Sequence, residues 1–154
     1  MSDGRPRVLF LCTGNSARSQ MAEAILRHLT KGAVDVESAG SNPRSDIHPL
    51  AGETVTKVLG IEMSGQHPKP VAPFLTERFD WVITVCDRAA EVCPTFPGAE
   101  IVRWSLSDPA EAGGSDAEKR RAFENSAKDL VGRIRLWLSL PDVAAKVRTG
   151  ASRV

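Results

Sequence analysis

The sequence predicts a single α/β domain with a four-stranded parallel sheet and helices on both faces. Its 154 residues suffice for one domain with its own core. Apolar runs of strand length alternate along the chain with segments of helical periodicity. This alternation favours a parallel sheet, because parallel strands need crossover connections that are usually helical.

Four segments have the composition of strands. Arg7 to Cys12 and Asp80 to Cys86 are mainly apolar runs, as expected of strands covered on both faces. Val34 to Ala39 alternates and stops at Gly40, and Ala99 to Trp104 is the fourth strand. Because sites in such sheets form at the carboxyl ends of the strands, the two cysteines that end strands indicate where the site lies.

Three segments have apolar residues at helical spacing: Ala17 to Leu29, Leu50 to Leu59 and about Ala117 to Leu138. The sequence has neither an internal repeat nor an internal linker. We therefore assign residues 1–140 to the domain. Pro141 to Val154 has little to pack, and we expect it to be a mobile tail.

The composition is that of an ordinary globular protein, with 42% hydrophobic and 25% charged residues. A formal net charge of +1 argues against nucleic acid or an anionic membrane as a partner. No apolar run approaches the ~20 residues that span a bilayer, and the start of the chain makes a poor signal peptide. The three cysteines fit reactive thiols in a reducing compartment better than a disulfide framework. We therefore expect a cytoplasmic protein.

The segment CTGNSARS places an arginine after a cysteine with five residues between them. A tight turn of this length that leads into a helix directs backbone N–H groups toward one centre and forms an anion cradle. We expect Gly14 to supply the unusual backbone angles of the loop and Arg18 to bind two oxygens of a tetrahedral oxyanion. The expected oxyanion-binding residues are Thr13, Gly14, Asn15, Ser16, Ala17, Arg18 and Ser19.

The same loop predicts that Cys12 is a nucleophile. Amide dipoles, the helix N-terminus and the guanidinium of Arg18 all favour a thiolate, so we expect its pKa to lie well below ~8.5. Ser16 and Ser19 are expected to add hydroxyl hydrogen bonds to the sulfur, and Asn15 to hold the loop in place. An inert buried thiol is the alternative for a lone cysteine. A nucleotide-binding P-loop is excluded, because the Gly-Lys-Ser/Thr ending is missing.

Cys86 and Cys93 follow in the segment CDRAAEVCP. If the strand that ends at Cys86 lies beside the one that ends at Cys12, the strand axes are about 4.8 Å apart. A disulfide needs Cα atoms near ~5.5–6 Å, so these two thiols could bond after a small adjustment. Cys93 lies seven positions further, about two helical turns or on the order of 10 Å, so it meets Cys86 only if the intervening segment loops or unwinds. We therefore predict a mobile segment here.

Two other interpretations of these thiols are weaker. A zinc site would need further ligands at suitable spacing, and the histidines His28, His48 and His67 are scattered. Burial in the core suits Cys86, which ends a strand, better than Cys93, which lies in a proline-containing loop. Three thiols, one of them an oxyanion nucleophile, instead indicate a relay by thiol–disulfide exchange.

A leaving oxygen needs a proton, and Asp108 in the segment WSLSDPAEAGG is the candidate acid. The proline that follows it stiffens the loop, and the later glycines allow the loop to move. On residue type alone, an Asp-Pro pair is more often a simple turn.

Two of these motifs resemble those of a known family. CTGNSARS after an apolar strand resembles the phosphate loop of the low-molecular-weight protein tyrosine phosphatase fold. The longer CTGNSARSQMAEAILR resembles the branch of that fold made up of thioredoxin-coupled arsenate reductases. VITVCDRAAEVCP resembles the relay segment of these reductases, a pair of cysteines that phosphatases of the fold generally lack. The resemblance covers Val8 to about Leu138.

The resemblance implies an arsenate reductase whose catalytic residues are Cys12, Arg18, Cys86, Cys93 and Asp108. It implies arsenate as the substrate, with phosphate or sulfate as a mimic, and a thioredoxin-like reductant as the partner. We also expect a monomer without a cofactor. The alternative is a low-molecular-weight protein tyrosine phosphatase that acts through a cysteinyl-phosphate, which the absence of tyrosine after Asp-Pro makes weaker. A non-catalytic module that binds oxyanions or senses redox state is a further alternative.

Three further positions concern a cation. Glu23 and Ser38 match positions that, with the loop asparagine, hold a potassium ion in some members of the reductase family. Lys69 stands where the remaining carboxylate ligand is expected, and its ammonium could take the place of the ion, so we predict no metal. The alternative is that Glu23 and Lys69 are ordinary surface charges. Ala17 replaces the cysteine that the family usually has just before the loop arginine, and the three-thiol relay does not need it.

Overall fold

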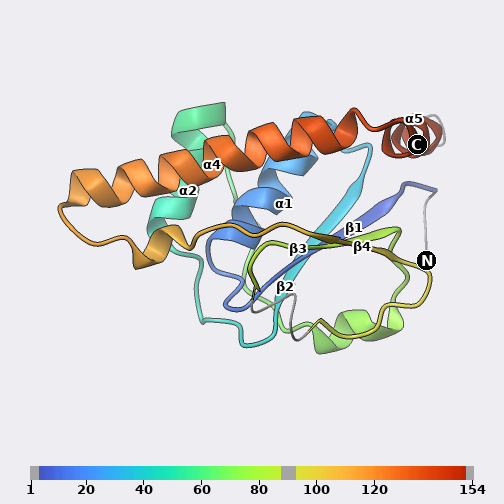
Figure 1. Cartoon of the computed structure of the whole chain (residues 1–154), viewed down its shortest axis with the longest axis horizontal. Helices are drawn as coiled ribbons and strands as arrows, with labels where there is room; N and C mark the ends of the chain where they lie inside the picture. Colours follow the sequence, from blue (N-terminus) through green and yellow to red (C-terminus); the bar gives the residue numbers. More distant parts are fainter. Residues whose placement is uncertain (1–3, 88–92, 152–154) are drawn as a thin grey trace.

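A computed structural model describes residues 4–87 and 93–151 of the chain. The elements are, in order, β1 (Arg7–Cys12), α1 (Arg18–Leu29), β2 (Asp35–Gly40), α2 (Pro49–Leu59), η1 (Ala72–Thr76), β3 (Trp81–Thr84), β4 (Glu100–Arg103), η2 (Pro109–Glu111), α4 (Asp116–Leu138) and α5 (Pro141–Ala151) (Figure 1). The two η elements are 3-10 helices. None of the described helices combines the length and apolar character that crossing a membrane requires.

The sheet has four strands in the order β2-β1-β3-β4, and every neighbouring pair is parallel. In the register, Cys12 pairs with Gly40 on one side, and Leu11 pairs with Thr84 on the other. The N–H of Val85 still donates to the carbonyl of Leu11 at 2.9 Å, so Cys86 follows just beyond the end of β1. The predicted fold class is confirmed, and both strand-ending cysteines lie at one edge of the sheet.

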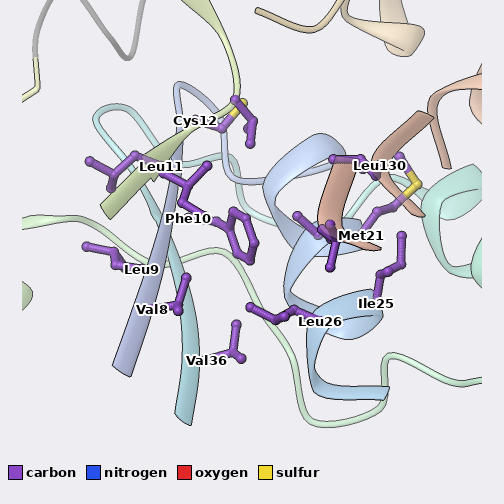
Figure 2. Close-up of a cluster of buried hydrophobic side chains, with 14 of the residues drawn as sticks. Val8, Leu9, Phe10, Leu11, Cys12, Met21, Ile25, Leu26, Val36 and Leu130 are labelled. Carbon is purple, nitrogen blue, oxygen red and sulfur yellow. The ribbon is translucent and has the colours of Figure 1, made fainter. Parts of the chain in front are cut away.

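Side chains of β1 alternate between the two faces of the sheet. Figure 2 shows Val8 and Phe10 pointing toward helix α1, where Met21 packs, while Leu9 and Leu11 point to the opposite side. All four β1 residues are at most 3% exposed, which explains the nearly continuous apolar run. The strand is therefore a buried support that fixes the position of the cysteine at its end.

Helices lie on both faces of the sheet. Helices α1, α2 and α4 lie on one side, and the short helix η1 lies on the other (Figure 1). Helix α4 reaches β3 through Trp137, whose ring meets Trp81 edge to face at 5.0 Å between centroids. Phe74 of η1 packs on Phe79 at 6.0 Å, and Phe79 packs in turn on Phe96.

Residues 141–151 form helix α5, where the sequence predicted a tail with little to pack. The expected lack of packing is wrong, because Val143 is buried with 3% exposure. Lys146 Nζ also binds Asp80 Oδ1 at 3.1 Å and lies 5.0 Å from the centre of the Trp81 ring. With the partly buried Val147, these anchors are two valines and one lysine, a pattern too sparse to detect by periodicity. The mobility of this segment stays a prediction.

Candidate active site

The loop between β1 and α1 presents unpaired hydrogen-bond donors. Ala17, the N-cap of α1, supplies no capping side chain, and the first turn of the helix carries no acidic residue. Within the described part of the chain, no acceptor meets the backbone N–H groups from Gly14 to Arg18. The helix N-terminus adds partial positive charge at the same place. The loop is therefore suited to an anion.

The carbonyl groups of the loop are held from outside by the segment 41–48. Four backbone N–H groups donate to them: Ser41 to Cys12 at 3.3 Å, Asn42 to Thr13 at 2.9 Å, Arg44 to Gly14 at 2.9 Å and His48 to Ser16 at 2.9 Å. Figure 1 shows this segment, between β2 and α2, running past the β1–α1 loop. A Cβ on Gly40 would lie 2.5 Å from the carbonyl oxygen of Thr13, so only glycine allows β2 to approach the loop this closely.

The unusual backbone angle of the loop belongs to Asn15, with φ of 49°, and not to Gly14. The expected role of Gly14 is therefore wrong. A Cβ on Gly14 would instead lie 3.1 Å from Nε of Arg44, so this glycine makes room for an arginine side chain. Asparagine tolerates the left-handed region better than most residues do, which explains its presence at the strained position.

The buried Asn15 side chain holds the loop in place, as predicted. Its Nδ2 donates to Ser19 Oγ at 2.8 Å, and its Oδ1 accepts from Gln20 Nε2 at 3.1 Å. The same Oδ1 accepts from the backbone N–H of Lys69 at 2.9 Å. The Ser16 hydroxyl donates to the carbonyl of Asp46 at 3.0 Å. The expected bond from Ser16 to the Cys12 sulfur is therefore not formed.

Cys12 and Cys86 are two neighbouring buried thiols of the cavity lining. Thr13 Oγ1 lies 3.6 Å from Cys86 Sγ. The hydrogen bond with Cys86 and the burial of the sulfur raise the pKa of Cys12, whereas the charge of Arg18 and the backbone N–H of Thr13 lower it. The raising causes are larger, so the expected low pKa is wrong for this state of the protein. Sequence reasoning placed Cys86 near Cys12 but did not include its effect on the pKa of Cys12.

Replacing Cys86 by alanine is expected to lower the pKa of Cys12. The variant loses the largest cause of the raised pKa, while Arg18 and the Thr13 N–H continue to favour the thiolate. The rate of alkylation of Cys12 by iodoacetamide, followed against pH on the Cys12 peptide, should therefore reach its midpoint at a lower pH than in the wild type. An unchanged or higher midpoint would contradict the assigned cause.

Arg18 and Asp108 meet above the loop. Arg18 Nη1 donates to the carbonyl of Leu106 at 2.8 Å, and Nη2 lies 3.6 Å from Asp108 Oδ2. Asp108 is the N-cap of η2, and its Oδ1 accepts from the N–H of Ala110 at 2.9 Å. Arg18 Nε is buried and has no hydrogen-bond partner within the described residues. A buried donor of this kind calls for an acceptor such as a bound oxyanion.

A cavity of about 730 Å³ brings these groups together. It is lined by Cys12, Thr13, Gly14, Asn15, Ser16, Ala17, Arg18, Asn42, Pro43, Arg44, His48, Cys86, Asp87, Leu106, Asp108, Ala110 and Glu111. Of the predicted site residues in the described ranges, Ser19 and Cys93 are absent from this lining. Sequence reasoning assigned no site role to Arg44, His48, Asp87 or Glu111. No motif marks the segment that carries Arg44 and His48, whereas Asp87 and Glu111 lie inside the quoted motifs beside the residues that were assigned roles.

Comparisons with known proteins agree with this geometry. A family model described as low molecular weight phosphotyrosine protein phosphatase matches residues 7–135. This chain belongs to that family. An arsenate reductase of Halalkalibacterium halodurans is 39% identical over 84% of this chain and 93% of its own. This relative places the chain in the arsenate reductase branch of the phosphatase family.

Solved structures agree as well. A thioredoxin-dependent arsenate reductase of Corynebacterium glutamicum superposes with a TM-score of 0.63 at 35% identity, over 86% of this chain and 63% of that one. An arsenate reductase in its phosphate-binding state superposes with a TM-score of 0.73 at 30% identity, over 87% of this chain and 97% of that one. The phosphatase-family fold therefore extends over most of the chain.

The third thiol of this phosphatase-family chain, Cys93, lies apart from the cavity. It is half-buried, and its Sγ lies 3.5 Å from the carbonyl oxygen of Pro94. Burial raises the pKa of the Cys93 thiol, and the nearby charge of Arg103 opposes this change. Residues 88–92, on which the predicted mobile segment falls, lie outside the described residues.

Lys69 lies where the sequence predicted a substitute for a cation. Its Nζ lies 3.9 Å from Glu23 Oε1 and 3.7 Å from Glu37 Oε1. The buried Glu23 also accepts from Ser38 Oγ at 2.6 Å and pairs with Arg27 at 2.6 Å. The ammonium thus adds positive charge beside a buried carboxylate, next to the Asn15 network. In the described ranges, no group of three or more acidic, histidine or cysteine side chains is arranged to hold a metal ion.

Proposed function

We propose that this protein is an arsenate reductase that uses Cys12, Cys86 and Cys93 in a disulfide relay. The carrying observation is that Cys12 and Cys86, both buried, lie together with Arg18 in the lining of one cavity. A phosphatase needs one nucleophilic sulfur, whereas a reduction needs a second sulfur within bonding reach of the first. The names of the relatives support the same activity.

In the first step, arsenate enters the loop and accepts hydrogen bonds from its unpaired N–H groups and from Arg18 Nε. Cys12 Sγ attacks arsenic, and one arsenate oxygen leaves as water. Asp108 donates one proton to the departing arsenate hydroxyl, which leaves as water, and the S–H proton of Cys12 then re-protonates Asp108. The product is a Cys12 thioester of arsenic(V).

In the second step, Cys86 Sγ attacks Cys12 Sγ. The electron pair of the S–As bond passes to arsenic, which becomes arsenic(III) and leaves as arsenite with the proton of Cys86. The two sulfurs are oxidised to a Cys12–Cys86 disulfide. The proximity of the two thiols supports this step, because Cys86 lies close enough to Cys12 to be the largest cause of its raised pKa.

In the third step, Cys93 attacks Cys86, releases Cys12 as a thiol and forms a Cys86–Cys93 disulfide. Cys93 is half-buried while the other two are buried, so this transfer moves the disulfide toward solvent. A dithiol reductant of the thioredoxin type then reduces it and becomes a disulfide itself. The solved thioredoxin-dependent relative supports this choice of partner.

The setting of this activity is proposed as well. All three cysteines are free thiols, which suits a reducing cytoplasm. Because one chain supplies every proposed residue, the mechanism needs no second copy, and we propose that the protein acts as a monomer. Phosphate has the shape and charge of arsenate, so the same site should also hydrolyse phosphomonoesters slowly.

Arsenite production tests the proposed function. We expect the purified protein to convert arsenate to arsenite over many turnovers with thioredoxin, thioredoxin reductase and NADPH, and Cys12→Ser to be inactive. Hydrolysis of p-nitrophenyl phosphate, measured alongside, should be the slower reaction. Efficient hydrolysis without arsenite would support the phosphatase alternative. Binding of phosphate without either reaction would support a non-catalytic module.

A further inference from the structure

The charges around the cavity raise the question of how a dianion enters it. Three carboxylate side chains line it, those of Asp87, Asp108 and Glu111, against the guanidinium groups of Arg18 and Arg44. Asp108 lies within ion-pair distance of Arg18. The carboxylates already outnumber the guanidiniums, and without Arg44 only Arg18 would oppose three of them, so the lining would repel a doubly charged oxyanion more strongly.

Arg44 is held on the oxyanion loop itself. Its backbone N–H donates to the carbonyl of Gly14 at 2.9 Å. Its side chain lies along Gly14, since a Cβ added there would be 3.1 Å from Nε and 3.3 Å from Cγ of the arginine. Glycine at position 14 therefore leaves room for the Arg44 side chain to lie against the loop that receives the anion.

Of the two arginines in the lining, Arg18 pairs with Asp108, whereas Arg44 has no carboxylate partner among the described residues. The ion pairs formed by other arginines of the chain involve Arg7, Arg18, Arg27, Arg120 and Arg133. Arg44 is exposed to solvent at the cavity, so its charge is available to an incoming anion.

We infer that Arg44 recruits the oxyanion and selects for its double negative charge. This inference deepens the proposed function, since it assigns a specificity-determining residue to the same site. Arg18, which lies against Leu106 and Asp108, binds the anion inside the loop. Arg44 acts at the rim, through a charge that salt screens over about 8 Å at physiological ionic strength.

Protection of Cys12 from alkylation measures this role without arsenate reduction. Inorganic phosphate at pH 8 should slow the reaction of Cys12 with iodoacetamide. In Arg44→Gln, the phosphate concentration that halves this rate, the protection constant, should rise about fivefold at low salt. The difference should nearly vanish in 0.5 M KCl, and Arg44→Lys should restore most of the protection. The matched control is Arg133→Gln, an equal charge change on α4 outside the cavity lining, which should behave as the wild type.

The kinetic readout separates recruitment from a structural effect. Arg44→Gln should raise KM for arsenate by about the same factor with a smaller change in kcat, whereas a distorted loop would lower kcat. Equal protection constants for Arg44→Gln and wild type, or an equal shift in Arg133→Gln, would overturn the inference. If the wild type makes no arsenite while phosphate still protects Cys12, the proposed function fails and the protection constants alone decide the role of Arg44.

Discussion

Cys86→Ser is expected to stop arsenite formation, lowering the steady-state rate by ~10³-fold or more. Serine keeps the size of the side chain and a hydrogen bond to Cys12, but its hydroxyl does not attack the Cys12–arsenic thioester and form a disulfide. Without that attack, the S–As electron pair has no route to arsenic. Arsenite measured under multiple turnover with the thioredoxin system checks this result.

Cys93→Ser serves as the matched variant, because it removes a thiol of the same chain outside the cavity lining. We expect a burst of about one arsenite per chain, after which the protein stays in the Cys12–Cys86 disulfide form. Rapid quenching gives the amount of arsenite formed per chain, and mass spectrometry of the Cys12 and Cys86 peptides gives the fraction joined in the disulfide. Normal arsenite turnover in either variant would refute the relay, whereas slow phosphomonoester hydrolysis should continue in both, because it needs neither Cys86 nor Cys93.

The sequence predicted those parts of the site that lie close together along the chain or at the carboxyl ends of neighbouring parallel strands. Cys12 and Arg18 are near neighbours along a loop, and Cys86 lies two residues after β3, which pairs with β1, so topology alone brings it to the same edge. The alternation of strands and helices was sufficient for this result, since a parallel sheet aligns all its carboxyl ends. Long, buried β1 gave the clearest signal, because every residue from Val8 to Leu11 is buried.

Features that depend on side chains from separate segments were not predictable. The pKa of Cys12 depends on which of two nearby groups, Arg18 or Cys86, acts more strongly on one sulfur, and the sequence gives no distances. Arg44 reaches the loop only because Gly14 leaves space and the segment after β2 binds the loop carbonyls. Such contacts have neither periodicity nor a motif, so only the folded chain reveals them.

Arg18→Lys is expected to lower kcat/KM for arsenate by about 10²- to 10³-fold, although the positive charge remains. Lysine lacks the planar fork, so it loses the buried Nε donor that has no partner in the described protein. It also loses the bond from Nη1 to the carbonyl of Leu106, which positions the segment that carries Asp108. Steady-state arsenite formation gives the size of the loss.

Two further measurements separate these causes. Protection of Cys12 by phosphate reports anion binding alone, and it should weaken in Arg18→Lys. If the loss of Asp108 positioning contributes, Asp108→Asn should cost less in the Arg18→Lys background than in the wild type. A kcat/KM within about threefold of the wild type would mean that a point charge suffices at this position, and the bidentate geometry assigned to Arg18 would be wrong.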